Sequence, residues 1–280
     1  MLFRSLGASH GFNSVHGRMP SVATGANLAN KDLIYLGVSG DGDSASIGLG
    51  QFAHAMRRGV NMVYIVENNG VYGLTKGQFS ATADKGSKSK RGVINSDEPI
   101  DMVGLALQLG ASFVGRSFSG DKSQLVPLIK AAIEHRGAAF IDVVSPCIAF
   151  NNHPGSTKSY DYVREHNEAV NRLDFITGRE EITTDYAAGT VTTVKQHDGS
   201  ILRLRKIAED YDATDRIKVM NYLQERAAAG EVVTGLLYVN PDSQDLHEHM
   251  QTMPTPLNTF GARDLCPGSV TLEKINASMR

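Results

Sequence analysis

The sequence predicts an α/β fold, in which a mostly parallel sheet carries helices on both faces and is followed by an appended C-terminal α+β segment. In the first two thirds, apolar runs of strand length alternate with helical stretches that are apolar on one face. Continuous apolar strands are typical of a parallel sheet that is covered on both sides. The last third is more polar. We expect residues 1–160 to form one domain and residues 161–280 to pack on it or on a partner subunit.

The elements of the first part follow from these patterns. Four short apolar runs predict strands at residues 32–39, 61–66, 112–116 and 138–144. Between them, apolar residues three or four apart predict helices at residues 44–58, 99–109 and 121–136. Residues 67–95 are rich in Gly, Lys and Ser and are expected to form a long loop.

In residues 161–280, the first predicted element is a β-hairpin. Asp198-Gly199 lies between two strand-like runs, residues 191–194 and 201–204, and Asp-Gly is a common hairpin turn. A helix at residues 213–229 and a strand at residues 232–239 follow, and the chain is polar with scattered prolines from residue 240.

Composition excludes several classes of protein. The chain has 280 residues, 41% of them hydrophobic, and a net charge of −2, so neither a nucleic acid nor a membrane surface is an expected partner. No apolar run approaches the ~20 residues that span a bilayer, and the N-terminus lacks a signal-peptide pattern. The two cysteines form no disulfide framework. We therefore expect a cytoplasmic protein.

Two motifs follow successive predicted strands. GDG at residues 40–42 and Asn68-Asn69 are separated by the 25 residues 43–67. Parallel strands of one βαβ unit end at the same sheet edge, so the motifs can meet there. The Asp41 carboxylate and the Asn69 amide oxygen are suitable ligands for Mg²⁺ that also binds phosphate oxygens. Glycines and a helix N-terminus would accommodate a diphosphate.

Asp43 does not fit that scheme directly, because a second acid would repel a diphosphate. Two roles stay open for it: it accepts a hydrogen bond from a donor on the ligand, or it caps the helix that follows.

The spacing of GDG and Asn-Asn resembles the magnesium–thiamine diphosphate motif of thiamine-dependent enzymes, with two ordinary turns as the alternative. The stretches HGRMPSVATGANLAN, GDGDSASIG, NNGVYGLTKGQFSAT and SPCIAFNNHPGSTKSY are similar to the β subunit of 2-oxoacid:ferredoxin oxidoreductases, most of all the 2-oxoglutarate type. The resemblance covers nearly the whole chain. It implies a thiamine diphosphate-binding domain that acts with an α subunit, which supplies the activating glutamate.

The activity that this resemblance implies is oxidative decarboxylation of 2-oxoglutarate to succinyl-CoA. Coenzyme A takes the acyl group, and electrons pass through an iron–sulfur cluster to ferredoxin. Two alternatives stay open: a pyruvate or broad-range 2-oxoacid enzyme, and a non-catalytic subunit. A thiamine-dependent decarboxylase or synthase is not expected, because it would carry its own activating glutamate and a third domain in the same chain.

The resemblance also implies site residues. Mg²⁺ would be held by the side chains of Asp41 and Asn69 and by the carbonyl of Val71. The residues expected to bind thiamine diphosphate are Gly40, Gly42, Asp43, Asn69, Gly73, Leu74 and Thr75. His16 would lie near the reacting end or the diphosphate, with a structural histidine as the alternative. Lys76 would pair with the distal carboxylate of 2-oxoglutarate, with a solvated loop lysine as the alternative.

The iron–sulfur ligands are the point of departure from the family pattern. A [4Fe–4S] cluster needs four ligands, usually cysteines, and only Cys147 matches a family position. Cys266 is expected to be structural. The chain is expected to be shortened at its N-terminus relative to the family, with the missing cysteines in the absent part.

Overall fold

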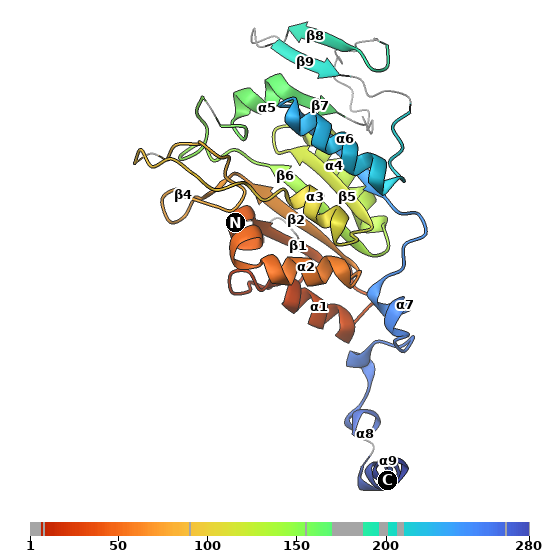
Figure 1. Ribbon diagram of the computed structural model, residues 1–280. Helices are drawn as coiled ribbons and strands as arrows, with labels where there is room; N and C mark the ends of the chain where they lie inside the picture. The colour runs from red at the N-terminus through yellow and green to blue at the C-terminus, as the bar shows by residue number, and fades with distance from the viewer. Residues whose placement is uncertain are drawn as a thin grey trace.

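A six-stranded sheet forms the centre of the protein in the computed structural model, which describes residues 7, 9–89, 91–154, 156–169, 187–195, 201–205, 210–266 and 268–279. Its strand order is β1-β2-β6-β5-β10-β7 (Figure 1). These strands are β1 (Leu36–Gly40), β2 (Met62–Asn68), β5 (Phe113–Phe118), β6 (Ala138–Val144), β7 (Asn167–Ala169) and β10 (Val232–Val239). The first four are parallel, and β10 runs antiparallel to β5.

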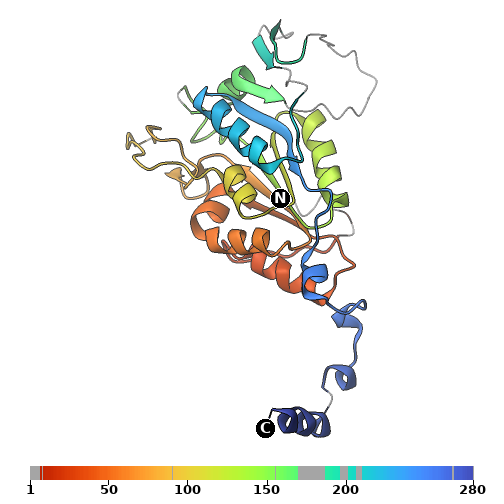
Figure 2. The ribbon, with the colours of Figure 1, turned by 45° about the vertical axis from the view of Figure 1, so that its right-hand side comes forward.

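Helices cover both faces of this sheet, as the sequence predicted. The helices that the structure describes are α1 (Met19–Ala29), α2 (Leu49–Arg57), α3 (Met102–Gln108), α4 (Lys122–Glu134), α5 (Tyr160–His166), α6 (Arg216–Ala228), α7 (Leu246–Met250), α8 (Ala262–Leu265) and α9 (Ser269–Ser278). Figure 2 shows α2, α3 and α6 on one side of the sheet and α4 on the other.

Alternation along the strands explains the two faces. Met62, Tyr64 and Val66 of β2 belong to the core beneath α2, α3 and α6, whereas Val63 and Ile65 belong to the core beneath α4. Successive strand residues point to opposite faces, so a continuous apolar run supplies both cores. On the first face, Phe52 packs edge-on against Tyr64 and Phe140, with ring centroids 5.4 and 5.1 Å apart.

The second part of the chain adds to the same sheet. β10 lies at residues 232–239, where the sequence predicted a strand, and pairs with β5. The predicted hairpin is also present, as β8 (Val191–Lys195) and β9 (Ile201–Arg205), while its turn lies outside the described residues. The division at residue 160 stays a prediction. In Figures 1 and 2, α8 and α9 lie away from the sheet.

Several boundaries differ from the sequence prediction. The first strand begins at Leu36, because residues 32–35 are irregular and Ile34 is exposed. The helix expected over residues 44–58 is divided into a π-helix, Gly42–Ile47, and α2. The expected loop over residues 67–95 includes a small hairpin of β3 (Val71–Tyr72) and β4 (Gln78–Phe79).

Candidate thiamine diphosphate and magnesium site

The carboxyl ends of β1, β2 and β6 lie side by side and bring three loops together. Gly40 of β1 pairs with Glu67 of β2, and Asn68 of β2 pairs with Val144 of β6. The loop after β6 then folds back, since the Asn151 side-chain amide donates to the Asn69 carbonyl at 2.8 Å. The expected meeting of the GDG and Asn-Asn motifs is therefore observed at one edge of the sheet.

Asp41 is the centre of this edge. Its side chain is buried, with only 1% of the residue exposed. Oδ2 accepts hydrogen bonds from the Gly70 backbone at 2.9 Å, from Thr82 at 2.5 Å and from Ser80. Oδ1 has one long contact, 3.4 Å from the Asn69 backbone nitrogen. One carboxylate oxygen is thus held by neutral donors, and the other is left with acceptor capacity.

These ligands fit a magnesium ion. A buried carboxylate is costly without a counter-charge, and Asp41 forms no ion pair with a basic side chain among the described residues. The Asn69 side-chain oxygen accepts from the Val71 backbone at 3.1 Å and keeps a second lone pair.

A different kind of metal site, built from three or more His, Cys, Asp or Glu side chains, is not found in the described part of the chain.

The side chain of Asn68, at the end of β2, is held by a hydrogen bond to Asp142. Its amide nitrogen donates to Asp142 at 3.0 Å, and Asp142 also accepts from Arg116 Nε at 2.9 Å. Burial alone would lower the pKa of Arg116, but the carboxylates of Asp142 and Asp101 raise it. The first asparagine of the pair therefore has a structural partner, whereas Asn69 directs its side chain back over its own turn.

Asp43 has other partners than Asp41. Its Oδ1 accepts from the Gly17 backbone at 2.8 Å and lies 2.8 Å from His16 Nδ1, and its Oδ2 accepts from Ser39. These contacts come from the N-terminal segment and from β1, rather than from the amides of the following helix. The structure therefore brings His16 and Asp43 together.

Gly73, Leu74, Thr75 and Lys76 form the turn between β3 and β4. Leu74 is 93% exposed, and Thr75 bonds Gln78. Lys76 is exposed and has a backbone φ of 79°, a region that disfavours side chains with a Cβ. A Cβ added at Gly73 would lie 3.6 Å from Cys147 Sγ, so the cysteine lies next to this turn.

The two glycines of GDG have different surroundings. A Cβ at Gly40 would meet open space, whereas a Cβ at Gly42 would lie 2.6 Å from the ring of Tyr72. Tyr72 also donates to the Gly42 carbonyl at 2.9 Å. The space that the missing side chain of Gly42 leaves is therefore occupied by the Tyr72 ring.

Sequence reasoning missed the hydroxyl groups around Asp41. Ser80 and Thr82 were within the quoted stretch NNGVYGLTKGQFSAT, but hydroxyl residues in a Gly-rich loop carry no pattern that distinguishes them. Only the folding of β4 back toward β1 shows their role.

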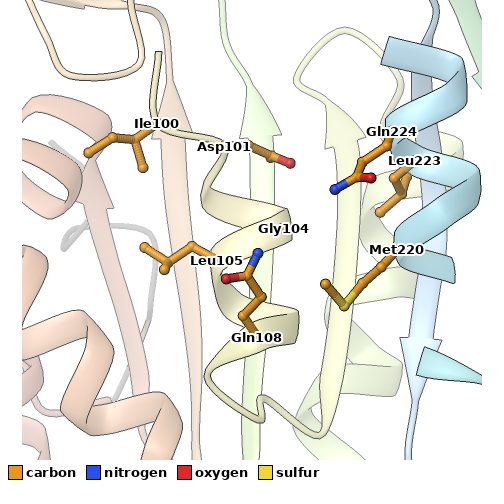
Figure 3. Close-up of a pocket in the computed structure, with 8 residues that line it drawn as sticks. All are labelled: Ile100, Asp101, Gly104, Leu105, Gln108, Met220, Leu223 and Gln224. Atoms are coloured by element: carbon orange, nitrogen blue, oxygen red, sulfur yellow. The ribbon is translucent and has the colours of Figure 1, made fainter. Parts of the chain in front are cut away.

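The described chain also has a cavity of about 410 Å³ between α3 and α6 (Figure 3). It is lined by Ile100, Asp101, Gly104, Leu105, Gln108, Met220, Leu223 and Gln224. None of the predicted site residues is among them. Its connection to the candidate site is Asp101, which pairs with Arg116 at 3.1 Å. We therefore place the candidate cofactor site at the sheet edge.

No helix among the described residues has both the length and the apolar character needed to cross a membrane.

Comparison with known proteins identifies the family of this chain. The thiamine pyrophosphate enzyme, C-terminal TPP binding domain, matches residues 4–143. The 2-oxoglutarate oxidoreductase subunit KorB of Mycobacterium tuberculosis is 44% identical over 145 residues, which are 51% of this chain and 39% of that protein. The 2-oxoacid:ferredoxin oxidoreductase subunit beta of Saccharolobus solfataricus is 46% identical over 145 residues, with 51% and 47% covered. This chain thus spans less than half the length of these relatives.

Two further matches cover a larger share of the chain. The 2-oxoglutarate synthase subunit KorB of Archaeoglobus fulgidus is 31% identical over 194 residues, which are 69% of this chain and 71% of that protein. A solved 2-oxoglutarate:ferredoxin oxidoreductase from Magnetococcus marinus, with 2-oxoglutarate, coenzyme A and succinyl-CoA bound, superimposes with a TM-score of 0.66. Its sequence identity is 28%, and 95% of this chain and 74% of that chain are covered. This chain therefore contains a thiamine diphosphate-binding domain and belongs to the family of 2-oxoacid:ferredoxin oxidoreductase β subunits.

Proposed function

We propose that this chain is the β subunit of a 2-oxoglutarate:ferredoxin oxidoreductase. With an α subunit it would decarboxylate 2-oxoglutarate oxidatively, transfer the succinyl group to coenzyme A and pass two electrons to ferredoxin. The observation that carries the proposal is the buried Asp41 carboxylate, which has a free acceptor position beside Asn69 at the carboxyl edge of the sheet. The cytoplasmic location stays a prediction.

The site residues would divide the binding work. Asp41 Oδ1, Asn69 Oδ1 and the Val71 carbonyl would hold Mg²⁺, and Ser80 and Thr82 would keep the Asp41 carboxylate in one orientation. Bound thiamine diphosphate supplies the carbon nucleophile and the electron sink that decarboxylation of a 2-oxoacid requires. The turn that contains Gly73, Leu74 and Thr75, together with the GDG backbone, would contact the cofactor.

Backbone strain supports a functional role for Lys76. A residue with a Cβ at φ 79° costs on the order of 1–3 kcal/mol, and strain of this kind gathers at functional sites. A loop lysine needed only for solubility could occupy a relaxed position, as the exposed Lys88 does. We propose that Lys76 is kept because its ammonium pairs with the distal carboxylate of 2-oxoglutarate, a group that pyruvate lacks.

Electron transfer in the proposed reaction would require an iron–sulfur cluster. Cys147 is half-buried beside Gly73 and would supply one ligand of a [4Fe–4S] cluster. Further ligands, the α subunit and ferredoxin are parts of the same proposal.

The test is co-expression of this chain with an α subunit of the same family. The purified complex is assayed for coenzyme A-dependent reduction of a redox dye with 2-oxoglutarate or pyruvate, after its thiamine diphosphate and iron are measured. We expect reduction that requires coenzyme A and a higher kcat/KM for 2-oxoglutarate. Equal or higher kcat/KM for pyruvate would contradict the substrate, and a cofactor-loaded complex without activity would indicate a non-catalytic subunit.

A further inference from the structure

We infer that Asp43 is a positioning residue for His16: it holds the imidazole with the proton on Nδ1 and directs Nε2 outward at the cofactor edge. This inference rests on the proposed function for its role in catalysis, while the arrangement itself is a property of this chain. It gives the second acid of GDGD a role different from that of Asp41.

Three donors converge on the Asp43 carboxylate. The Gly17 backbone donates to Oδ1 at 2.8 Å, Ser39 donates to Oδ2, and His16 Nδ1 lies 2.8 Å from Oδ1. An ionised carboxylate only accepts hydrogen bonds. The His16 contact therefore requires a proton on Nδ1, which leaves Nε2 as the acceptor in the neutral ring.

Asp43 is the acidic side chain of this cluster. Tyr64 lies beside it on β2 and donates to Ser44 at 2.9 Å. Burial, and to a lesser degree the charge of Asp43, raise the pKa of Tyr64 to about 12, so that phenol stays neutral at the pH values at which enzymes act. Ser39 is neutral as well. Of the two side chains that contact the Asp43 carboxylate, Ser39 and His16, only His16 has a second polar atom directed elsewhere.

The backbone of His16 is fixed independently of its ring. Gly17 has a φ of 73°, and a Cβ there would lie 2.8 Å from the Ile47 side chain and 2.9 Å from the Gly48 nitrogen. A Cβ at Gly48 would lie 2.9 Å from the Gly17 Cα. Two glycines therefore pack backbone against backbone, and residues 16–17 are docked on the end of the π-helix Gly42–Ile47.

The exposed end of the ring faces away from these contacts. The His16 side chain is 77% exposed, and within the described ranges Nε2 has no hydrogen-bond partner. A carboxylate that fixes tautomer and orientation while the second nitrogen stays free is the arrangement that general acid–base catalysis uses. Nε2 is therefore the atom at which we expect a proton to be accepted or donated near the cofactor.

The first test needs neither cofactor nor activity. The full chain is labelled with ¹⁵N-histidine, and the His16 resonances are assigned by their loss in His16→Gln. We expect a single Nδ1-protonated tautomer in the wild type. Asp43→Asn should retain it, because the amide oxygen can still accept from Gly17 and His16. Asp43→Ala should give a mixture of tautomers, and the control Asp32→Ala should not. An unchanged tautomer in Asp43→Ala would overturn the inference.

The second test uses the complex with the α subunit. We expect Asp43→Ala to lower kcat about 100-fold, as a misplaced catalytic group does, with little change in KM for the 2-oxoacid. Asp43→Asn should recover most of kcat. The double variant Asp43→Ala/His16→Gln should be no slower than His16→Gln alone. Multiplied losses in the double variant would show that Asp43 acts independently of His16. A complex with no activity in the wild type would contradict the proposed function, while the tautomer measurement would still decide on the pair.

Discussion

The carboxylate of Asp41 accepts a hydrogen bond from the backbone of Gly70 at 2.9 Å, and this contact joins the end of β1 to the turn after β2. The same oxygen accepts from Ser80 and Thr82, which lie beyond β4. One buried oxygen thus holds three segments in place, while Oδ1 keeps a free position. This division of the carboxylate is the reason we propose the corner as a cation site.

The hydroxyl of Thr82 should contribute to cofactor affinity without touching the cofactor. Partners that orient a metal ligand typically account for a factor of about 10–100 in metal affinity. We expect Thr82→Val to weaken Mg²⁺-dependent thiamine diphosphate binding by a factor in this range, measured by calorimetry on the complex. Thr24→Val, which removes a hydroxyl bonded to the Pro20 carbonyl within α1, is the control. Equal affinity in Thr82→Val and wild type would show that this hydroxyl does not position Asp41.

Lys76→Gly should change stability and specificity in opposite directions. Glycine relieves the strain at φ 79°, and part of that gain is offset by the entropy of glycine in the unfolded chain, so we expect unfolding to cost about 1 kcal/mol more. In the complex, kcat/KM for 2-oxoglutarate should fall about 100-fold more than that for pyruvate, as expected when one partner of a desolvated charge pair is lost. Urea unfolding and steady-state assays measure the two effects.

The matched control for this variant is Lys88→Ala, which removes an exposed lysine from the same long loop. Lys88→Ala should leave the ratio of kcat/KM for 2-oxoglutarate to kcat/KM for pyruvate unchanged. A similar loss on both substrates in Lys76→Gly would mean that Lys76 does not recognise the distal carboxylate.

Tyr64 should make stability depend on pH in the alkaline range. Burial raises its pKa from 10.0 to about 12, so the folded state favours the neutral phenol. The corresponding stabilisation is fully present below pH 10 and is lost as the pH rises from 10 to 12. It amounts to on the order of 2–3 kcal/mol. Denaturant unfolding between pH 8 and 12 should therefore show a steeper loss in wild type than in Tyr64→Phe. Parallel curves would show that Tyr64 titrates normally.

The strands that could be predicted are those that are buried on both faces, because burial requires apolar residues along most of their length. Residues 138–144 and 232–239 are mostly apolar runs, and both strands have the predicted bounds. An apolar run has the same pattern in a parallel and in an antiparallel strand. The sequence therefore did not predict the antiparallel pairing of β10 with β5. Leu33 and Ile34 are apolar but exposed, which is why the first strand was predicted to begin too early.

The proximity of Asp41 and Asn69 could be predicted because their motifs follow successive strands at a fixed spacing. Asp41 and Asn69 lie in one corner because the strands before them are neighbours in a parallel sheet. The π-helix Gly42–Ile47 ends at Gly48, which packs against Gly17 of a distant segment. The pairing of Asp43 with His16 involves the same distant segment. Such tertiary contacts leave no periodic signal in the sequence.

The most direct test of the central claim is calorimetric titration of the complex with thiamine diphosphate in the presence and absence of Mg²⁺. We expect wild type and Asp32→Ala to bind one thiamine diphosphate per chain in a Mg²⁺-dependent manner. Asp41→Ala should lose more than about 100-fold in affinity, since even the outer partners of a metal ligand contribute up to that factor. Mg²⁺-dependent binding of unchanged affinity in Asp41→Ala would contradict the assignment of this corner as the cofactor site.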